Sequence, residues 1–282
     1  QTTRESSAIL YLPDALSRLT TTVRTITATS SRTKQQACVE ALLDAYNHSP
    51  ERAGMSAIRL SPVSNPVETT RDLVTVNLDA SARSMVPEGF FPLRVAITNT
   101  LTELFGVKYV NILVDGQDVG LDLIGLLPTG VMARYPGVEI SSYWRQILDQ
   151  QASAGAVELQ KAAALYFVSA DGTSLLGEVR NIAIREWDLA AYANLLVEEL
   201  SKGATQIEGA LRVMPSSDYL QRNPVLLSEE RIIELYFGEE IDSFLMLSGY
   251  TRGMLLSSLC YTLSSFIPRF GGLIAYVNGE KV

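Results

Sequence analysis

The chain has 282 residues, of which 47% are hydrophobic and 19% are charged, so it is long and apolar enough for about two domains with separate cores. This composition excludes intrinsic disorder, a collagen-like repeat and a small disulfide scaffold. The net charge of −8 argues against a protein that binds the phosphates of nucleic acid, and the single histidine argues against most catalytic triads and zinc sites.

Two features of the chain concern its compartment. It opens on a polar stretch, Gln1 to Ser7, with no initiator methionine, as in a mature exported protein or in a chain that has been shortened. No apolar run reaches the roughly 18 residues of a membrane-spanning helix. We therefore expect no membrane-spanning segment.

The first half of the chain shows alternating and helical patterns in a regular order. Residues 74–78 alternate between apolar and polar side chains, as in a half-buried strand. Residues 93–104 place leucine and isoleucine on one helical face, and residues 110–114 form a strand pattern that ends at the turn dipeptide Asp115-Gly116. The predicted order is strand, strand, helix, strand, strand, helix, strand, at residues 8–12, 23–26, 39–43, 57–62, 74–78, 93–104 and 110–114.

The same order recurs in the second half of the chain. The seven segments align in order with residues 163–167, 179–182, 192–196, 210–215, 233–237, 255–266 and 273–277. Their offsets drift only between 153 and 163 residues, which chance similarity does not explain. One helical face of this half, which begins at Leu189, is predicted to end at Gly203 as its C-cap.

Each half is therefore predicted to be an α+β domain of the order β-β-α-β-β-α-β, a two-layer sandwich in which two helices cover one face of a single sheet. The domains are expected at residues 8–120 and 163–282, joined by a connecting segment at 121–162. In this segment, Ser141 is a candidate N-cap of a helix that runs to Gln151 and carries Trp144, Ile147 and Leu148. We expect this apolar segment to pack between the domains rather than to act as a flexible linker.

The end of the first repeat resembles a known family. The helix end Asn-Thr-Leu-Thr-Glu-Leu at residues 99–104, a short turn and a strand that closes on Asp115-Gly116 are similar to the final motif of the GerMN domain (sporulation and spore germination protein M). The strand at Leu10 to Pro13 resembles the opening of that domain, and strands at Leu60-Ser61 and Leu78-Asp79 follow in the order of the family. The second copy is degenerate, since residues 262–266 replace the helix motif and Pro268 interrupts the turn.

The resemblance implies an extracytoplasmic, often lipid-anchored, envelope protein of a Gram-positive bacterium, with no known catalytic residues and no cofactor. GerMN domains are also similar to the ring-building modules of export and sporulation assemblies, in which such α+β units pack side by side. The expected partners are other envelope proteins or further copies of the chain, and not nucleic acid. Membrane association would depend on an N-terminal lipid anchor that has been removed.

Two sequence features of the first half could carry catalysis. Ser31 and Lys34 form the Ser-x-x-Lys pair of penicillin-binding enzymes, but the Ser-Asp-Asn and Lys-Thr-Gly motifs of those enzymes do not occur. Ser31 is therefore expected in the N-cap region of the first helix. His48 follows that helix, where it is expected to cap helix carbonyls rather than to act as a base.

The acidic residues of the second half allow two interpretations. Glu239, Glu240 and Asp242, with Glu229-Glu230 nearby, could bind calcium or serve as the acid and nucleophile of a glycosidase. No glycine-containing calcium loop surrounds them, so a solvated surface is favoured. Neither Gly203 nor Gly271-Gly272 has the sequence context of a phosphate-binding loop.

An apolar stretch after the first repeat is either a domain interface or a partner-binding patch. It comprises Leu121, Leu123, Ile124, Leu126, Leu127, Val131 and Met132.

The two cysteines, Cys38 and Cys260, are expected to be unpaired, because they lie on helices of different domains. Cys260 is further expected to be a buried small hydrophobic residue. One histidine and two distant cysteines do not supply a structural zinc site.

The sequence thus predicts a non-catalytic envelope protein with two tandem GerMN-like domains that act as an interaction or assembly module, with a link to sporulation or germination. No catalytic, cofactor-binding or metal-binding residue is assigned. The alternative is a cell-wall glycan hydrolase or binder that uses acidic residues of the second domain. Two carboxylates about 5–10 Å apart in a cleft beside exposed aromatic rings would favour this alternative. Partner surfaces are expected on the outer sheet faces and edges.

Overall fold

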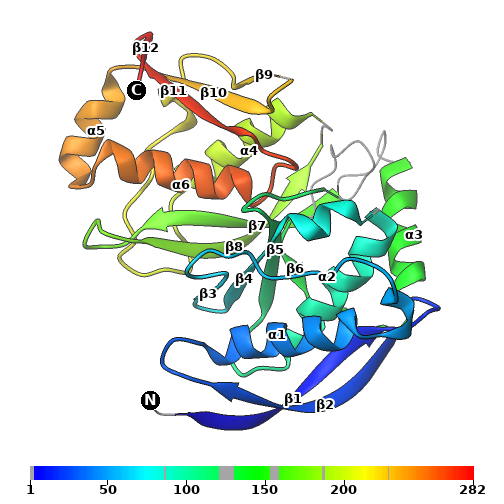
Figure 1. Ribbon diagram of the computed structural model, residues 1–282. Helices are drawn as coiled ribbons and strands as arrows, with labels where there is room; N and C mark the ends of the chain where they lie inside the picture. Colours follow the sequence, from blue (N-terminus) through cyan, green and yellow to red (C-terminus); the bar gives the residue numbers. More distant parts are fainter. Residues whose placement is uncertain (1–2, 86, 121–129, 153–158, 186–187, 228) are drawn as a thin grey trace. The chain divides into compact units, whose positions relative to one another are not determined.

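The computed structural model describes residues 3–85, 87–120, 130–152, 159–185, 188–227 and 229–282. Packing divides the chain into two compact units, one of residues 1–116 and 131–159 and the other of residues 117–130 and 160–282. The segment that we expected to connect the domains is thus shared between the units. Figure 1 shows the elements of both units.

The first unit has the predicted order of elements, with one correction. The strand predicted at residues 57–62 is absent, since only Leu60 forms an isolated bridge there, and the strand at this place in the order is Val67–Thr70. The strands and helices of the unit are β1 (Arg4–Pro13), β2 (Leu19–Ala28), α1 (Lys34–Asn47), β3 (Val67–Thr70), β4 (Leu73–Leu78), α2 (Pro87–Thr102), β5 (Tyr109–Val114), β6 (Met132–Ala133) and α3 (Ile140–Ala152). Short 3₁₀ helices lie at Pro50–Arg52 and Ala80–Ser84.

The second unit repeats this order and adds a helix. Its elements are β7 (Leu159–Val168), β8 (Leu175–Ile184), α4 (Leu189–Ser201), a 3₁₀ helix (Ser217–Tyr219), β9 (Val225–Leu227), β10 (Ile232–Phe237), α5 (Glu240–Ser248), α6 (Arg252–Ser264), β11 (Gly272–Val277) and β12 (Glu280–Lys281). The additional α-helix is α5, which was not predicted; at the corresponding place between β4 and α2, the described residues of the first unit form only the short 3₁₀ helix Ala80–Ser84. The α+β class is confirmed.

The prediction of a single sheet in each domain is wrong. The strands of the first unit form a hairpin, β1-β2, and a separate sheet in the order β3-β4-β5-β6. Those of the second unit form β7-β8 and a sheet in the order β12-β11-β10-β9. Within the larger sheets, β4 is parallel to β5 and β10 is parallel to β11.

Hydroxyl groups of a helix bond to the backbone of the first strand of each hairpin. In the first unit, Thr100 of α2 accepts a hydrogen bond from the backbone N–H of Tyr11 in β1 at 2.9 Å. In the second unit, Thr262 of α6 accepts one from the N–H of Tyr166 in β7 at 3.1 Å, and Ser258 donates to the carbonyl of Tyr166. A helix therefore occupies the strand edge where a further strand would pair.

The helical faces predicted from the sequence are buried, with one exception. The buried positions are Leu93, Ile97 and Leu101 in α2, Leu255, Leu259 and Leu263 in α6, and Phe266 just beyond α6. The inner strand positions Val74, Val76 and Leu78 are buried as predicted, as are Ile233, Leu235 and Phe237. Leu104 is partly exposed, because α2 ends two residues earlier at Thr102.

The closing turns of the two units show the same geometry. Asp115 donates its backbone N–H to the carbonyl of Leu78 at 2.8 Å, and Asn278 donates to that of Phe237 at 2.9 Å. Both turn residues have a positive φ, +49° and +50°, a conformation that aspartate and asparagine adopt more readily than most residues. The sequence alignment of these segments is therefore confirmed.

The predicted alignment of residues 57–62 with 210–215 is wrong in register. Leu60 forms a bridge with Leu78, whereas the residue that forms the corresponding bridge with Phe237 is Leu220. The sequence alignment had matched Leu60 with Val213. The loop after α4 is longer than the loop after α1, and similarity in residue type concealed this difference.

Two predicted helix starts also need correction. The N-cap of α1 is Thr33, whose hydroxyl accepts a hydrogen bond from the N–H of Gln36 at 3.1 Å, so Ser31 lies outside the helix. Helix α3 begins at Ile140, which places Ser141 inside the first turn rather than at the N-cap. Gly203, with φ of +79°, directly follows the C-cap residue of α4, as the sequence indicated.

Candidate functional site

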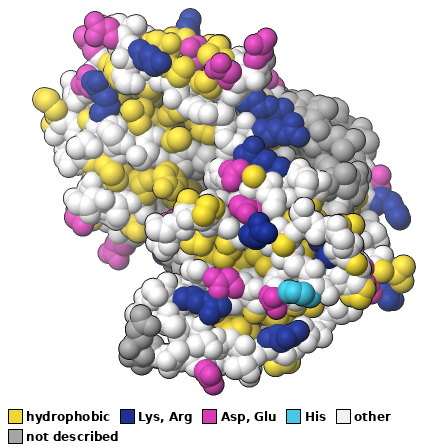
Figure 2. Space-filling model, viewed as in Figure 1, with side chains coloured by type: hydrophobic (Ala, Val, Ile, Leu, Met, Phe, Trp, Pro, Cys, Tyr) yellow, Lys and Arg dark blue, Asp and Glu magenta, His cyan; other side chains and the backbone are white. Residues whose placement is uncertain are grey.

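His48 and the Ser-x-x-Lys pair have structural roles. His48 is the C-cap residue of α1, and its Nδ1 donates to the carbonyl of Asp44 at 2.8 Å. Its side chain is 79% exposed, and the histidine is visible on the surface in Figure 2. Lys34 is the first residue of α1, so it does not lie one helical turn beyond Ser31 inside a helix, as the penicillin-binding mechanism requires.

The acidic cluster lies at the start of α5. Glu239 and Glu240 are exposed, and Asp242 forms an ion pair with Arg252 at 2.6 Å. On the face shown in Figure 2, acidic side chains lie scattered among other residue types. Within the described ranges, no group of three or more histidine, cysteine, aspartate or glutamate residues could hold a metal ion. A solvated helix end is the interpretation that this geometry supports.

Only part of the predicted apolar patch can be placed. Val131 and Met132 are 6% and 8% exposed and belong to the first unit. Their burial supports packing inside that unit rather than an open patch. The other predicted residues of the patch, Leu121, Leu123, Ile124, Leu126 and Leu127, lie outside the described residues.

Both cysteines are free thiols, as predicted. Cys38 is completely buried, and burial raises the pKa of its thiol to about 11. Cys260 is only partly buried, so the prediction of full burial is wrong for this residue. It lies on the side of α6 next to the buried stripe rather than within it.

The polar residues of the helix motif hold the first unit together. Asn99 exchanges two hydrogen bonds of 2.9 Å with the backbone of Tyr135. Glu103 accepts a hydrogen bond from the Tyr11 hydroxyl at 2.5 Å and pairs with Arg134. These bonds fasten the chain after β6 to α2 and β1. The motif that carries the family resemblance is therefore structural.

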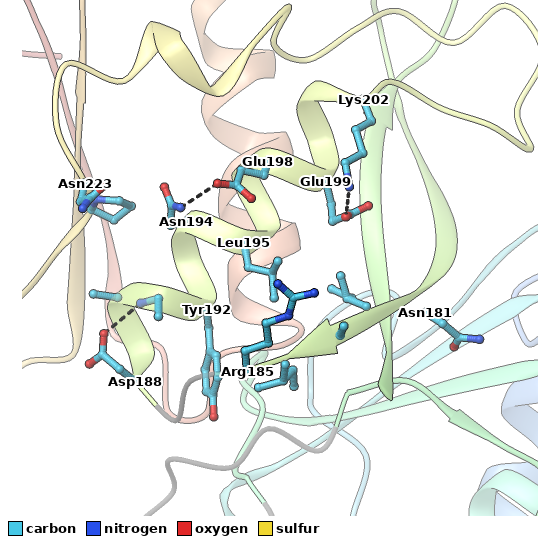
Figure 3. Close-up of a pocket in the computed structure, with 16 residues that line it drawn as sticks. Asn181, Arg185, Asp188, Tyr192, Asn194, Leu195, Glu198, Glu199, Lys202 and Asn223 are labelled. Carbon is cyan, nitrogen blue, oxygen red and sulfur yellow. Dashed lines mark hydrogen bonds and ion pairs between the residues drawn. The ribbon is translucent and has the colours of Figure 1, made fainter. Parts of the chain in front are cut away.

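A groove of about 940 Å³ opens in the second unit between β8, α4 and Asn223-Pro224. Five consecutive residues, 181–185, line one wall, so the edge of β8 faces the groove. Figure 3 shows Asn194 and Glu198 on α4, with Arg185 beside the middle of the same helix.

The acidic side chains of this groove are engaged in structural contacts. Asp188 caps α4 by accepting a hydrogen bond from the N–H of Ala191 at 2.9 Å, and Glu198 accepts one from Asn194 at 3.0 Å. Glu199 forms ion pairs with Arg180 and Lys202. These carboxylates line the groove and at the same time stabilise the helix and its neighbours, which favours a structural role for them over that of a glycosidase pair.

A buried carboxylate lies close to the groove. Glu178 is 1% exposed and accepts hydrogen bonds of 2.8 Å from the backbone of Thr205 and of Gln206, together with an ion pair of 2.6 Å from Arg180. Burial acts to raise the pKa of Glu178, but these donors outweigh burial and lower the pKa. The network ties β8 to the loop after α4.

A cluster of aromatic and charged side chains lies on the outer face of the second unit's larger sheet. The rings of Tyr236 in β10 and Tyr276 in β11 are stacked, with centroids 4.7 Å apart and planes inclined by 4°. The Arg222 guanidinium lies 3.5 Å from the centre of the Tyr236 ring. Glu234 accepts hydrogen bonds from the hydroxyls of Tyr236 at 2.6 Å and of Tyr276 at 3.2 Å. We call these four residues the aromatic face.

The aromatic face is directed away from the core. Ile233, Leu235 and Phe237, which alternate with Glu234 and Tyr236 along β10, are buried in the core of the second unit. Tyr236 and Tyr276 remain partly exposed. The hydrogen bond to Glu234 raises the pKa of Tyr236, and burial followed by the bond to Glu234 raises that of Tyr276, so both hydroxyls stay protonated donors.

The corresponding face of the first unit is different. The positions equivalent to Tyr236 and Tyr276 are Asn77 and Leu113. Asn77 accepts a hydrogen bond from the N–H of Gly116 at 2.7 Å, and Leu113 is buried. Our sequence analysis missed the aromatic face, although tyrosine at the outward positions of two adjacent strands was a signal that could have found it.

Comparison with known proteins found one family model that matches part of the chain. Residues 9–120 match the model of the Germane family, which is described as sporulation and spore germination. No curated protein matches the chain significantly.

Two solved structures are distantly similar. The tandem GerMN domains of the sporulation protein GerM from Bacillus subtilis are 17% identical, with a TM-score of 0.36 over 98% of this chain and 92% of that chain. A Clostridium perfringens protein provisionally described as a lipoprotein is 18% identical, with a TM-score of 0.23 over 42% of this chain and 78% of that chain.

Proposed function

Because residues 9–120 match the model of the Germane family of sporulation and spore germination, we propose that the chain is an interaction module of the bacterial envelope, without catalytic activity of its own. It is exported and held at the membrane by an N-terminal lipid anchor. No helix in the described part of the chain is long and apolar enough to cross a membrane. The second unit binds an envelope partner, and the first unit supplies the family domain.

The observation that carries this proposal is the aromatic face. Tyrosine and arginine are the residue types that contribute most to binding energy at protein interfaces. Here Glu234 holds the stacked rings through their hydroxyls and the Arg222 guanidinium lies over the Tyr236 ring, so little side-chain freedom is lost when a partner covers them. The partner that fits is a protein surface with apolar side chains for the rings and an acidic group for Arg222.

A second candidate function is binding of cell-wall glycan. An aromatic ring can stack on a sugar ring, and a neighbouring carboxylate can accept hydrogen bonds from sugar hydroxyls. Tyr276 and Glu234 offer these groups, whereas the Tyr236 ring already contacts both Tyr276 and Arg222. Hydrolysis has less support, because Glu234 bonds to both tyrosine hydroxyls and the groove carboxylates are engaged elsewhere.

Co-sedimentation of the purified chain with two envelope preparations separates these functions. One preparation keeps its proteins, and the other is the same cell wall after protease treatment. Binding of the wild type only to the first, with loss of binding in the Tyr236→Ala/Tyr276→Ala variant, is the expected result. Binding to both preparations supports the glycan function. Tyr261→Ala is the matched control, because Tyr261 is 51% exposed and lies outside the aromatic face. Equal binding by all three proteins would overturn the proposal.

A further inference from the structure

Strand β2 of the first unit has an open edge, and the hydrogen-bond pattern defines its extent. The N–H of Asp14 donates to the carbonyl of Arg18 at 2.9 Å and closes the β1-β2 hairpin. In an antiparallel pair, bonded residues alternate with residues whose backbone groups point outward. Even-numbered residues of β1 and β2 therefore bond to each other in the observed register, and odd-numbered residues point outward.

Two bonds on the outer edges agree with this assignment. Tyr11, an odd-numbered residue of β1, donates its N–H outward to Thr100. Leu19, an odd-numbered residue of β2, donates its N–H outward to the carbonyl of Val138 at 2.8 Å. The edge of β1 is thus covered by α2, and the beginning of β2 is covered by the segment around Val138.

The rest of the β2 edge has no such cover among the described residues. Its outward backbone groups belong to Thr21, Val23, Thr25 and Thr27. Thr21, Val23 and Thr25 are exposed, and Thr27 is partly exposed. Unpaired strand edges are normally protected by charged residues, proline or a bulge. This stretch carries a single charge and consists of residues that favour strands.

One apolar pair of side chains, flanked by threonines, lies beside this edge where a second strand would lie. Ile9 and Val23 stand directly opposite each other in the hairpin and are 40% and 66% exposed. A strand that pairs with β2 would cover Val23 and continue the apolar surface that begins at Ile9.

We propose that two copies of this chain pair antiparallel through β2 and form a dimer with a continuous four-stranded sheet. A two-fold axis at Val23 places this residue opposite Val23 of the other copy and Thr21 opposite Thr25 of the other copy. The outward groups of residues 21–25 are then all bonded, and the ladder stops at Leu19, whose N–H is already used. The Ile9 and Val23 side chains of both copies join into one apolar strip.

Charge disfavours one of the neighbouring registers. An axis at Arg24 would also pair outward groups, but it would place two arginines opposite each other, which is unfavourable. With the axis at Val23, Arg24 lies opposite Thr22 of the other copy. Because the interface uses the same surface on both copies, it closes as a dimer rather than growing into a fibre.

The second unit does not offer the same edge. The residue that corresponds to Val23 in the repeat is Val179, and its carbonyl accepts a hydrogen bond from the side chain of Gln206 at 3.0 Å. The pairing surface is therefore specific to the first unit. It is separate from the aromatic face, so the dimer goes beyond the proposed binding function and does not depend on it.

The test measures the average molar mass of the full chain in solution by analytical ultracentrifugation over a range of protein concentrations. The wild type is expected to dimerise, and Val23→Lys is expected to raise the dissociation constant of the dimer roughly tenfold or more, because two lysines would meet at the axis. Val63→Lys is the matched control, since Val63 is 50% exposed and lies in the loop before β3 rather than in β2. It is expected to dimerise like the wild type.

A second variant guards against a folding effect. Thr25→Pro removes an outward N–H that the hairpin does not use, so the hairpin is retained and the dimer is lost. Hydrogen exchange in residues 21–25 of the wild type is expected to slow as the dimer forms. A wild type that stays monomeric, or a dimer that Val23→Lys and Thr25→Pro leave unchanged, would overturn the proposal.

Discussion

The backbone N–H of Tyr11 and the hydroxyl of Thr100 are 2.9 Å apart, and the same bond joins Tyr166 to Thr262 at 3.1 Å in the second unit. Tyr166 lies 155 residues after Tyr11, and Thr262 lies 162 residues after Thr100. Both offsets are within the range that the sequence repeat predicted. A hydrogen bond between a strand and a helix has thus been retained in both copies, including the copy whose helix motif is degenerate.

This bond leads to a prediction about stability. Thr100 is 1% exposed, so Thr100→Val keeps the shape of the side chain but removes the acceptor of the partly buried N–H of Tyr11. We expect a loss of about 1–3 kcal/mol in the free energy of unfolding, measured with urea. Thr102→Val is the control, because the Thr102 hydroxyl bonds only to carbonyls of its own helix. Equal losses in both variants would contradict the structural role of the bond.

The buried carboxylate of Glu178 predicts a dependence of stability on pH. Its pKa is lower in the folded protein than in the unfolded chain, so its contribution is present above the unfolded value of about 4.3 and is lost as the pH falls through the folded value. Glu178→Gln should therefore lower the free energy of unfolding at pH 7 by about 1–3 kcal/mol. The loss should shrink below about pH 4.

Unfolding by urea at several pH values checks this prediction. Glu240→Gln is the control, because Glu240 is exposed and lies at the start of α5, outside the hydrogen bonds of Glu178. A constant difference between Glu178→Gln and the wild type at every pH would show that Glu178 does not act through its charge.

The two thiols are predicted to differ in reactivity. Cys38 is completely buried with a pKa of about 11, so maleimide should not label it in the folded protein at pH 8. Cys260 is partly exposed and should be labelled slowly, and both should react after denaturation without reductant. Mass spectrometry of labelled peptides gives the order in which the two thiols react. Labelling of Cys38 before Cys260, or the absence of free thiols after denaturation, would contradict the structure.

The order of elements and the inner faces could be predicted from the sequence, because both depend on apolar periodicity. Val76 alternates with polar neighbours and Ile97 lies on an apolar stripe, and both are buried. The division into hairpin and larger sheet could not be predicted, because Thr100 and Thr262 read as ordinary polar helix residues until their partners are known. Helix α5 was also missed. Its Met246 and Leu247 face solvent rather than a core, so its apolar residues do not mark one buried helical face.

The sequence predicted the type of candidate surface but not its location. Outer sheet faces and edges were expected to carry the function, but the sequence did not show which face or edge. Tyr236 and Tyr276 are far apart in the chain, and only the parallel pairing of β10 and β11 stacks their rings. The open edge of β2 depends equally on which strands lack neighbours, and this is a property of the topology.

Photo-crosslinking at the aromatic face tests the central claim most directly. A photoreactive phenylalanine analogue is placed at position 276 of the full chain in the cells that produce it, and at position 261 as the control. The account predicts that position 276 forms a covalent adduct with an envelope protein during sporulation or germination, and that position 261 does not. Absence of a protein adduct at position 276, or the same adducts at both positions, would contradict it.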